Sequence, residues 1–139
     1  MLIKKETFLS INKELKGNHY GFDNIFAIKL KKQGAKIYHI DNPVWHKGLE
    51  SNKLYLAKKE AAAQTILMLY KANKIEPGSN DLLKVFKILK KLRLTKVTAH
   101  LFNSLKKAIL KNLLGNNPNI LLLNIYRLGY VCNIYTNGK

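Results

Sequence analysis

The chain has 139 residues, of which 47% are hydrophobic, and this length and composition fit about one globular domain. No apolar run approaches the roughly 18 residues of a membrane-spanning helix, and the N-terminus lacks the apolar stretch of a signal peptide. The single cysteine, Cys132, excludes an intrachain disulfide and a cysteine-based zinc cluster. We therefore expect a cytoplasmic location.

The formal net charge of +17 is unevenly distributed along the chain. All 8 acidic residues lie within residues 1–81, whereas residues 82–139 contain eleven lysines and arginines and no acid. Such an asymmetry indicates an anionic partner for the second half. Nucleic acid and an anionic membrane surface are the two obvious candidates.

The first part of the chain predicts one uncertain element and one clear helix. Residues 1–18 fit a short strand or helix followed by a loop. The pattern from Asp23 to Gln33 predicts a helix, because Asp23 is a favoured N-cap type and lysines occupy the last turns. Gly34 is the expected stop.

A strand is predicted next, from Lys36 to Asp41, where β-branched and aromatic residues gather. Asn42 and Pro43 end it. Because one or two strands make no stable sheet alone, this strand requires neighbours that the chain does not supply.

The remainder of the chain predicts helices. Ser51 is expected to cap a long helix from Asn52 to about Asn73, and a linker follows at Glu76–Ser79. Three further helical patterns come after the linker: Asp81–Leu92, Lys96–Leu114 and Pro118–Leu128, with Asn117 as the cap of the last. We expect residues 129–139 to be frayed or to form a short strand.

The stretch from His19 to Ser51 carries the side chains with chemistry. Its order is a glycine, an acidic residue, an amphipathic helix, a glycine, a strand and then NPVWHKGLES. This order resembles the C-terminal half of the catalytic domain in family 2 glycosyltransferases, which have the GT-A fold. The resemblance covers about residues 1–60 with motif-level detail and the tail more loosely.

The resemblance implies a fold class and a domain division. The fold would be an α/β fragment, mostly helical, with one or two short strands. Residues 1–76 would form the C-terminal part of a GT-A (nucleotide-diphospho-sugar transferase) domain, and residues 77–139 a basic helical tail. The family's nucleotide-binding half and its Asp-x-Asp motif would lie upstream of Met1, and this chain has no Asp-x-Asp. We therefore expect the chain alone to be inactive.

The implied reaction transfers a sugar, with inversion, from a nucleotide-sugar donor to a hydroxyl of a glycan or lipid-linked acceptor. A divalent metal, Mg²⁺ or Mn²⁺, would assist it in the intact enzyme. Asp23 would be the catalytic base at the start of its helix. The alternative is that Asp23 is an N-cap and no more. The family usually has Glu-Asp here, so an alignment shifted by one residue would place Asn24 at the catalytic position.

Three residues after the predicted strand complete the predicted site. His46 would be a metal ligand, since imidazole can join carboxylates and phosphates around Mg²⁺ or Mn²⁺. Its alternative is an ordinary polar residue. Trp45 would stack on a sugar or fill the core, and Lys47 would contact phosphate or be solvated. We expect Asp23 and His46 to approach one another across one cleft.

The basic half supports a second class of function. Between residues 82 and 114 apolar residues recur at helical spacing among nine lysines and arginines. Such a segment either lies on an anionic membrane surface, with the protein peripheral at the cytoplasmic face, or packs its apolar face on the rest of the chain. Nucleic acid is the weaker candidate, because no recognised motif is present and the arginines are Arg93 and Arg127 alone.

Overall fold

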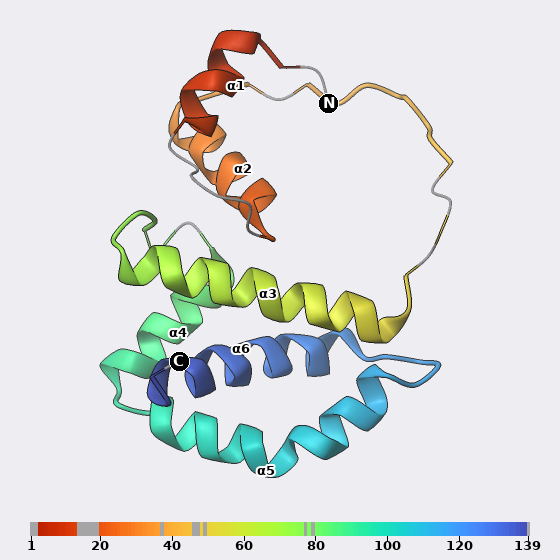
Figure 1. The fold of residues 1–139 in the computed structure, drawn as a ribbon, viewed down its shortest axis with the longest axis vertical. Coiled ribbons are helices and arrows are strands. Elements are labelled where there is room, and N and C mark those ends of the chain that lie inside the picture. Colours follow the sequence, from red (N-terminus) through yellow and green to blue (C-terminus); the bar gives the residue numbers. More distant parts are fainter. Residues whose placement is uncertain are drawn as a thin grey trace.

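A computed structural model of the chain describes residues 3–13, 20–36, 38–45, 48, 50–76, 78 and 80–138. These residues form α-helices and no strand, as Figure 1 shows. The predicted α/β fold, a GT-A fragment with one or two strands, is therefore wrong. The helices are α1 (Lys5–Asn12), α2 (Phe22–Lys32), α3 (Asn52–Lys71), α4 (Asp81–Lys91), α5 (Thr95–Leu113) and α6 (Ile120–Thr136).

The segment predicted as a strand, Lys36–Asp41, is irregular where the structure describes it, at residues 36 and 38–41, and the chain stays irregular through residue 45. Tyr38 is 81% exposed and Trp45 is 94% exposed, so the segment buries neither aromatic side chain. The physical reason is the one that the sequence indicates: a strand is stable only when a neighbour pairs with its backbone. Figure 1 shows this part of the chain running apart from the helices between α2 and α3.

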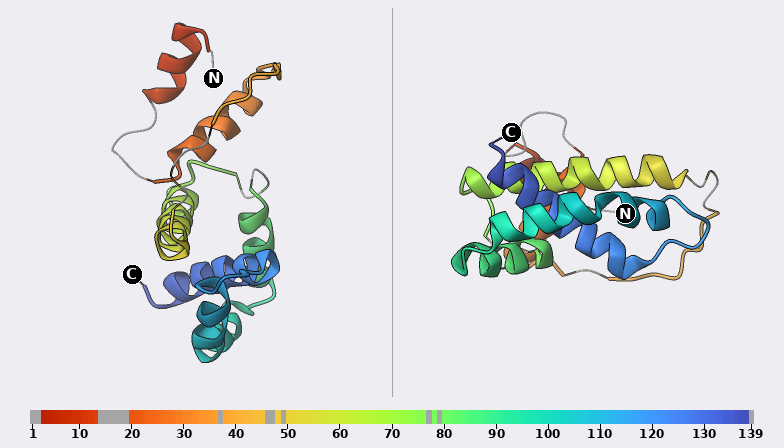
Figure 2. Two further views of the ribbon diagram at one scale, coloured as in Figure 1. Left: turned by 90° about the vertical axis from the view of Figure 1, so that its right-hand side faces the viewer. Right: turned by 90° about the horizontal axis from the view of Figure 1, so that it is seen from below.

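The helices α1 and α2 form an N-terminal pair beside α3 (Figures 1 and 2). The rings of Phe8 and Phe26 lie 5.5 Å apart between them. The N-cap of α2 is Gly21, with φ of +94°, and a Cβ there would lie 3.1 Å from Ala62 of α3. Glycine therefore fits this position for two reasons, its φ and its close approach to α3. The expectation that Asp23 is the cap is wrong.

The end of α2 agrees with the sequence. The backbone N–H of Gly34 (φ +70°) donates to the carbonyl of Lys31, and that of Ala35 donates to the carbonyl of Leu30. These two bonds are the Schellman arrangement that a glycine after a helix favours. The predicted stop at Gly34 is confirmed.

The four remaining helices form the body of the fold. The longest, α3, begins as predicted at Ser51, whose hydroxyl accepts from the backbone N–H of Leu54. It lies along α6, while α5 and α6 form an antiparallel pair and α4 crosses at one end (Figures 1 and 2). The predicted boundary at residue 77 stays a prediction.

Two hydrophobic cores hold these helices together. The first core is built around Phe86 of α4, which is fully buried, and includes residues of α2, α3, α5 and α6. The second core joins Leu56 of α3 to α5 and α6, with the rings of Phe102 and Tyr126 packed edge to face at 5.2 Å. Burial of these side chains, rather than helix propensity alone, stabilises the arrangement.

The last helix differs from the prediction at both ends. Its cap is Asn119, whose side-chain oxygen accepts from the backbone N–H groups of Leu121 and Leu122, so the predicted cap Asn117 is wrong. The helix then continues through Gly129 to Thr136, so the predicted frayed end or strand over residues 129–139 is also wrong. The apolar residues beyond Gly129, including the fully buried Val131 and Cys132, belong to the first core.

Candidate functional site

Asp23 lies in the first turn of α2 with an exposed side chain. Its carboxylate accepts a hydrogen bond of 3.3 Å from the side-chain amide of Asn24, which is exposed as well. A carboxylate at this position is stabilised by the positive end of the helix dipole. Its role as a catalytic base stays a prediction, as does the choice between Asp23 and Asn24.

Of the residues predicted after the strand, Trp45 is described and is almost wholly exposed, so it fills no core. His46 and Lys47 lie outside the described residues. The predicted approach of Asp23 and His46, and a phosphate contact by Lys47, therefore stay predictions. Within the described part of the chain, no three His, Cys, Asp or Glu residues are placed to hold a metal ion.

The basic helices carry a feature that the sequence reasoning missed, a second apolar face. On α4 the buried face is formed by Leu83 and Phe86. A different row, Val85, Ile88 and Leu92, is 44%, 57% and 59% exposed. These spacings of three and four residues place the row on one side of the helix.

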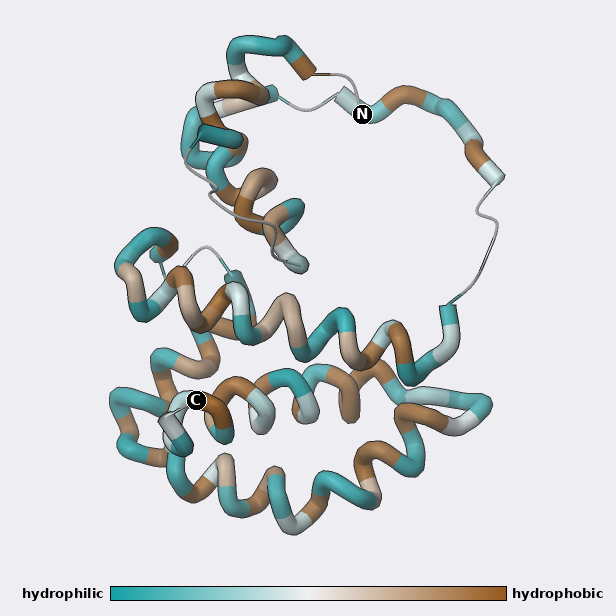
Figure 3. The backbone as a smooth tube through the Cα atoms, in the orientation of Figure 1, coloured by the Kyte–Doolittle hydropathy of each residue, from teal (hydrophilic) through white to brown (hydrophobic). Residues whose placement is uncertain are grey.

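On α5, too, the apolar residues form one buried row and one exposed row. Figure 3 shows polar and apolar residues alternating along this helix. Its buried face includes Phe102 and Ile109, which pack in the second core. Val97, Leu101 and Leu105 lie four residues apart and are 53%, 55% and 55% exposed. They form a second exposed row at helical spacing.

A tight turn joins the two rows. The backbone N–H of Leu94 donates to the carbonyl of Leu89, and Arg93 between the helices has φ of +59°. Leu92 ends the row on α4, and Leu94, 40% exposed, begins the row on α5. We call the seven residues together the apolar stripe: Val85, Ile88, Leu92, Leu94, Val97, Leu101 and Leu105.

Lysines border the apolar stripe. Lys87 and Lys91 directly precede Ile88 and Leu92, and Lys96 precedes Val97. Their side chains are exposed. At 3.6 residues per turn each of these lysines lies about 100° around the helix from the stripe residue that follows it, so the lysines flank the stripe. The pattern of a lysine followed by an aliphatic residue, which recurs at Lys84, Lys87, Lys91 and Lys96, was the signal in the sequence.

Other lysines of these helices are directed toward the body of the fold. Lys90 Nζ lies 5.6 Å from the centre of the Tyr70 ring and 5.3 Å from that of Tyr135. A hydrogen bond to Tyr135 is the largest cause that raises the pKa of Lys90. Lys106 Nζ lies 5.7 Å from the Phe102 ring centre. These contacts are cation–π geometry and support the internal packing.

Within the part of the chain that the structure describes, no helix combines the length and the hydropathy needed to cross a membrane. Comparisons of the chain with protein-family models, with curated proteins and with solved structures gave no match.

Proposed function

We propose that this chain is a basic helical module that docks peripherally on an anionic membrane surface through the apolar stripe. The observation that supports the proposal is the second apolar face of α4 and α5, whose residues stay 40% to 59% exposed although both helices already bury a first face. Exposed aliphatic rows of this length are uncommon on a protein surface that meets water alone.

The charges beside the apolar stripe favour an anionic membrane over other occupants. Amphipathic helices with lysines beside an apolar face bind at the boundary between head groups and acyl chains. Each cation near an anionic surface contributes on the order of 1 kcal/mol, and each half-exposed aliphatic side chain that leaves water adds a similar amount. A second copy of this chain would bring the same lysines together, so charge repulsion opposes self-association.

Vesicle co-sedimentation of the whole chain tests this proposal. We expect binding to vesicles that contain phosphatidylglycerol, much weaker binding to phosphatidylcholine vesicles, and loss of binding as salt is added, because exposed charges are screened over roughly 8 Å at physiological ionic strength. The Lys87→Gln/Lys91→Gln variant should bind about 30-fold more weakly, from two cations at about 1 kcal/mol each.

A matched variant separates the apolar stripe from net charge. Lys31→Gln/Lys74→Gln removes the same charge from α2 and from the residues after α3, so its binding should fall much less. Leu101→Gln/Leu105→Gln keeps every charge and should still weaken binding. Equal binding to both vesicle types, or equal losses in the two lysine variants, would contradict the proposal. Concentration-dependent dimers in place of vesicle binding would identify a second copy as the occupant.

A second proposal is that the chain is the C-terminal segment of a metal-dependent glycosyltransferase. The NPVWHKGLES motif supports it, together with the exposure of Trp45, which leaves the ring accessible to a sugar. The discriminating observation is an upstream reading frame that encodes an Asp-x-Asp motif. In the joined protein Asp23→Asn should lower turnover far more than donor affinity, because a base acts in the transition state. Unchanged turnover would remove Asp23 from the site.

A further inference from the structure

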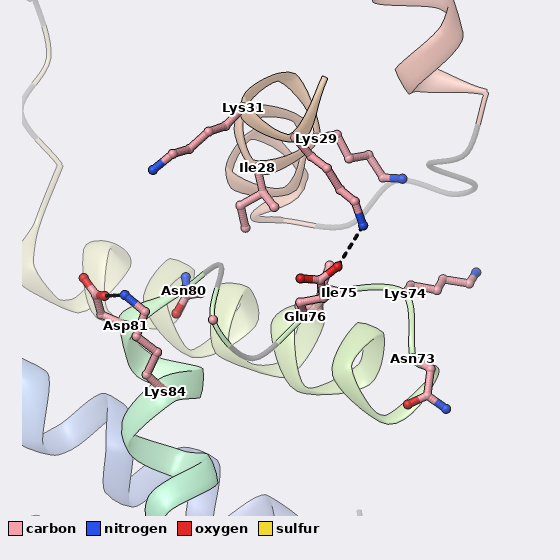
Figure 4. Close-up of a pocket in the computed structure, with 12 residues that line it drawn as sticks. Ile28, Lys29, Lys31, Asn73, Lys74, Ile75, Glu76, Asn80, Asp81 and Lys84 are labelled. Atoms are coloured by element: carbon pink, nitrogen blue, oxygen red, sulfur yellow. Dashed lines mark hydrogen bonds and ion pairs between the residues drawn. The ribbon is translucent and has the colours of Figure 1, made fainter. Parts of the chain in front are cut away.

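A groove of about 780 Å³ lies between the last turns of α2 and the connection from α3 to α4, away from the apolar stripe (Figure 4). Residues of α2, of α4 and of the connection between α3 and α4 line it. Its described lining includes five lysines and two carboxylates, which are Lys29, Lys31, Lys32, Lys74, Lys84, Glu76 and Asp81. We call it the lysine groove.

The two carboxylates are already paired. Lys32 Nζ lies 2.8 Å from Glu76 Oε1, and Lys84 Nζ lies 2.7 Å from Asp81 Oδ1 (Figure 4). These hydrogen bonds are the largest cause that lowers the pKa of both carboxylates, so both are ionised at neutral pH. Lysines therefore outnumber carboxylates, five to two, in the described lining.

Helix ends do not account for this excess. The lysines in the last turn of α2 suit the negative end of that helix, and Lys74 follows the negative end of α3. Each helix end carries the equivalent of about half a charge, so the two ends together offset about one lysine. The N-terminus of α4, capped by Asn80, lies in the same groove and adds about half a positive charge.

The pairs can also open at little cost. The side chains of Lys32 and Glu76 are each 75% exposed, and those of Lys84 and Asp81 are 53% and 93% exposed. Ion pairs this exposed are worth little, so their lysines can turn toward a stronger anion. Figure 4 shows Lys31 extending over the side of the groove where α4 begins with Asp81 and Lys84.

We propose that the lysine groove binds a diphosphate group. A diphosphate group brings several negative charges to a lining in which lysines outnumber carboxylates, and the groove is of the size that small-molecule sites have. Lysine binds phosphate as a point charge. None of the described lining residues is aromatic, so none of them stacks on a nucleobase. The ligand is therefore recognised by its phosphates, with the rest of the molecule directed into solvent. This proposal does not depend on membrane docking.

Isothermal titration of the whole chain with inorganic pyrophosphate tests this inference. We expect saturable binding of one pyrophosphate, at least about tenfold weaker binding of inorganic phosphate, and equal affinities for uridine and adenosine diphosphate. Lys31→Gln/Lys74→Gln should weaken pyrophosphate binding at least about tenfold. Both side chains are exposed, so this variant should keep its fold, which its thermal melt checks. Glu76→Gln should strengthen binding, since it removes a competing anion.

The control is Lys87→Gln/Lys91→Gln, which removes the same charge from α4 outside the groove and should leave pyrophosphate binding within about twofold. Equal losses in the two variants, or binding that does not saturate, would overturn the proposal. Vesicles that carry a diphosphorylated head group distinguish the source of the ligand. Vesicle binding that needs Lys31 and Lys74, without binding of free pyrophosphate, would assign the groove to a lipid head group. Binding of neither ligand would overturn the inference.

Discussion

Gly129 of α6 lies directly against the ring of Phe102 of α5. A Cβ at Gly129 would be 2.5 Å from Cδ2 of Phe102, a distance that no real side chain tolerates without movement. Phe102 is 4% exposed and packs against Tyr126, so its ring has little room to move. The close approach of α5 and α6 therefore depends on this glycine.

Gly129→Ala should lower the free energy of unfolding by about 2 kcal/mol, because overpacking at this contact outweighs the better helix propensity of alanine. Urea unfolding followed by circular dichroism measures the change. In a Phe102→Leu background, where the ring is absent, the cost of Gly129→Ala should shrink. An unchanged cost in that background would show that the strain lies elsewhere.

Arg93 follows the C-terminus of α4, and its backbone has the left-handed conformation, with φ of +59°. Its backbone N–H donates to the carbonyl of Lys90, which completes the Schellman arrangement with Leu94. Since this conformation costs a non-glycine residue roughly 1 kcal/mol or more, Arg93→Gly should raise the free energy of unfolding by about 1 kcal/mol. The matched change Lys91→Gly, inside the helix, should lower it by a similar amount. Destabilisation by both changes would contradict this account.

The helices could be predicted from the sequence because their signals are local. Ser51 and Gly34 act through hydrogen bonds to residues within four or five positions, so their types alone indicate where a helix begins or ends. The segment from Lys36 to Asp41 could not be decided this way, since strand formation depends on backbone partners distant in sequence. Gly129 misled for the same reason, because its role is a contact with another helix.

The candidate surfaces depend even more on the tertiary arrangement. The sequence showed that α4 and α5 are basic and amphipathic, but not which of their apolar residues the rest of the fold would bury. Leu83 and Ile88 are equally apolar, yet one is 1% exposed and the other 57%. The lysine groove combines residues of α2 with residues that follow α3. Lys32 and Glu76, which pair in it, are 44 positions apart in the sequence, so no short motif indicates the groove.

The cap of α6 offers a matched pair of asparagines. Asn119 Oδ1 accepts from Leu121 N at 2.7 Å, and Asn112 Oδ1 in turn accepts from Asn119 N at 3.0 Å. Asn119→Ala should therefore lower the free energy of unfolding by about 1 kcal/mol, the usual cost of losing a cap. Asn117→Ala, at the exposed position before Pro118, should change it by less than about 0.5 kcal/mol. Chemical unfolding of both variants decides between the two positions, and a larger effect at Asn117 would contradict the assigned cap.

Cys132 should make the protein less stable in alkali. Its side chain is fully buried in the first core, and burial raises the pKa of the thiol from its ordinary value of 9.0 to about 11. Below pH 9 the thiol is protonated in both the folded and the unfolded chain, so its contribution is fully present. Between pH 9 and 11 the unfolded chain loses the proton while the folded chain keeps it. Each pKa unit by which the folded thiol exceeds the unfolded one favours unfolding by about 1.4 kcal/mol.

Urea unfolding across this pH range tests the effect of the thiol. The free energy of unfolding should fall in the wild type by on the order of 2 kcal/mol more than in Cys132→Ala. Tyr126, whose pKa burial also raises, is present in both proteins and cancels in the difference. Parallel pH profiles of the two proteins would show that the thiol is not protected from water.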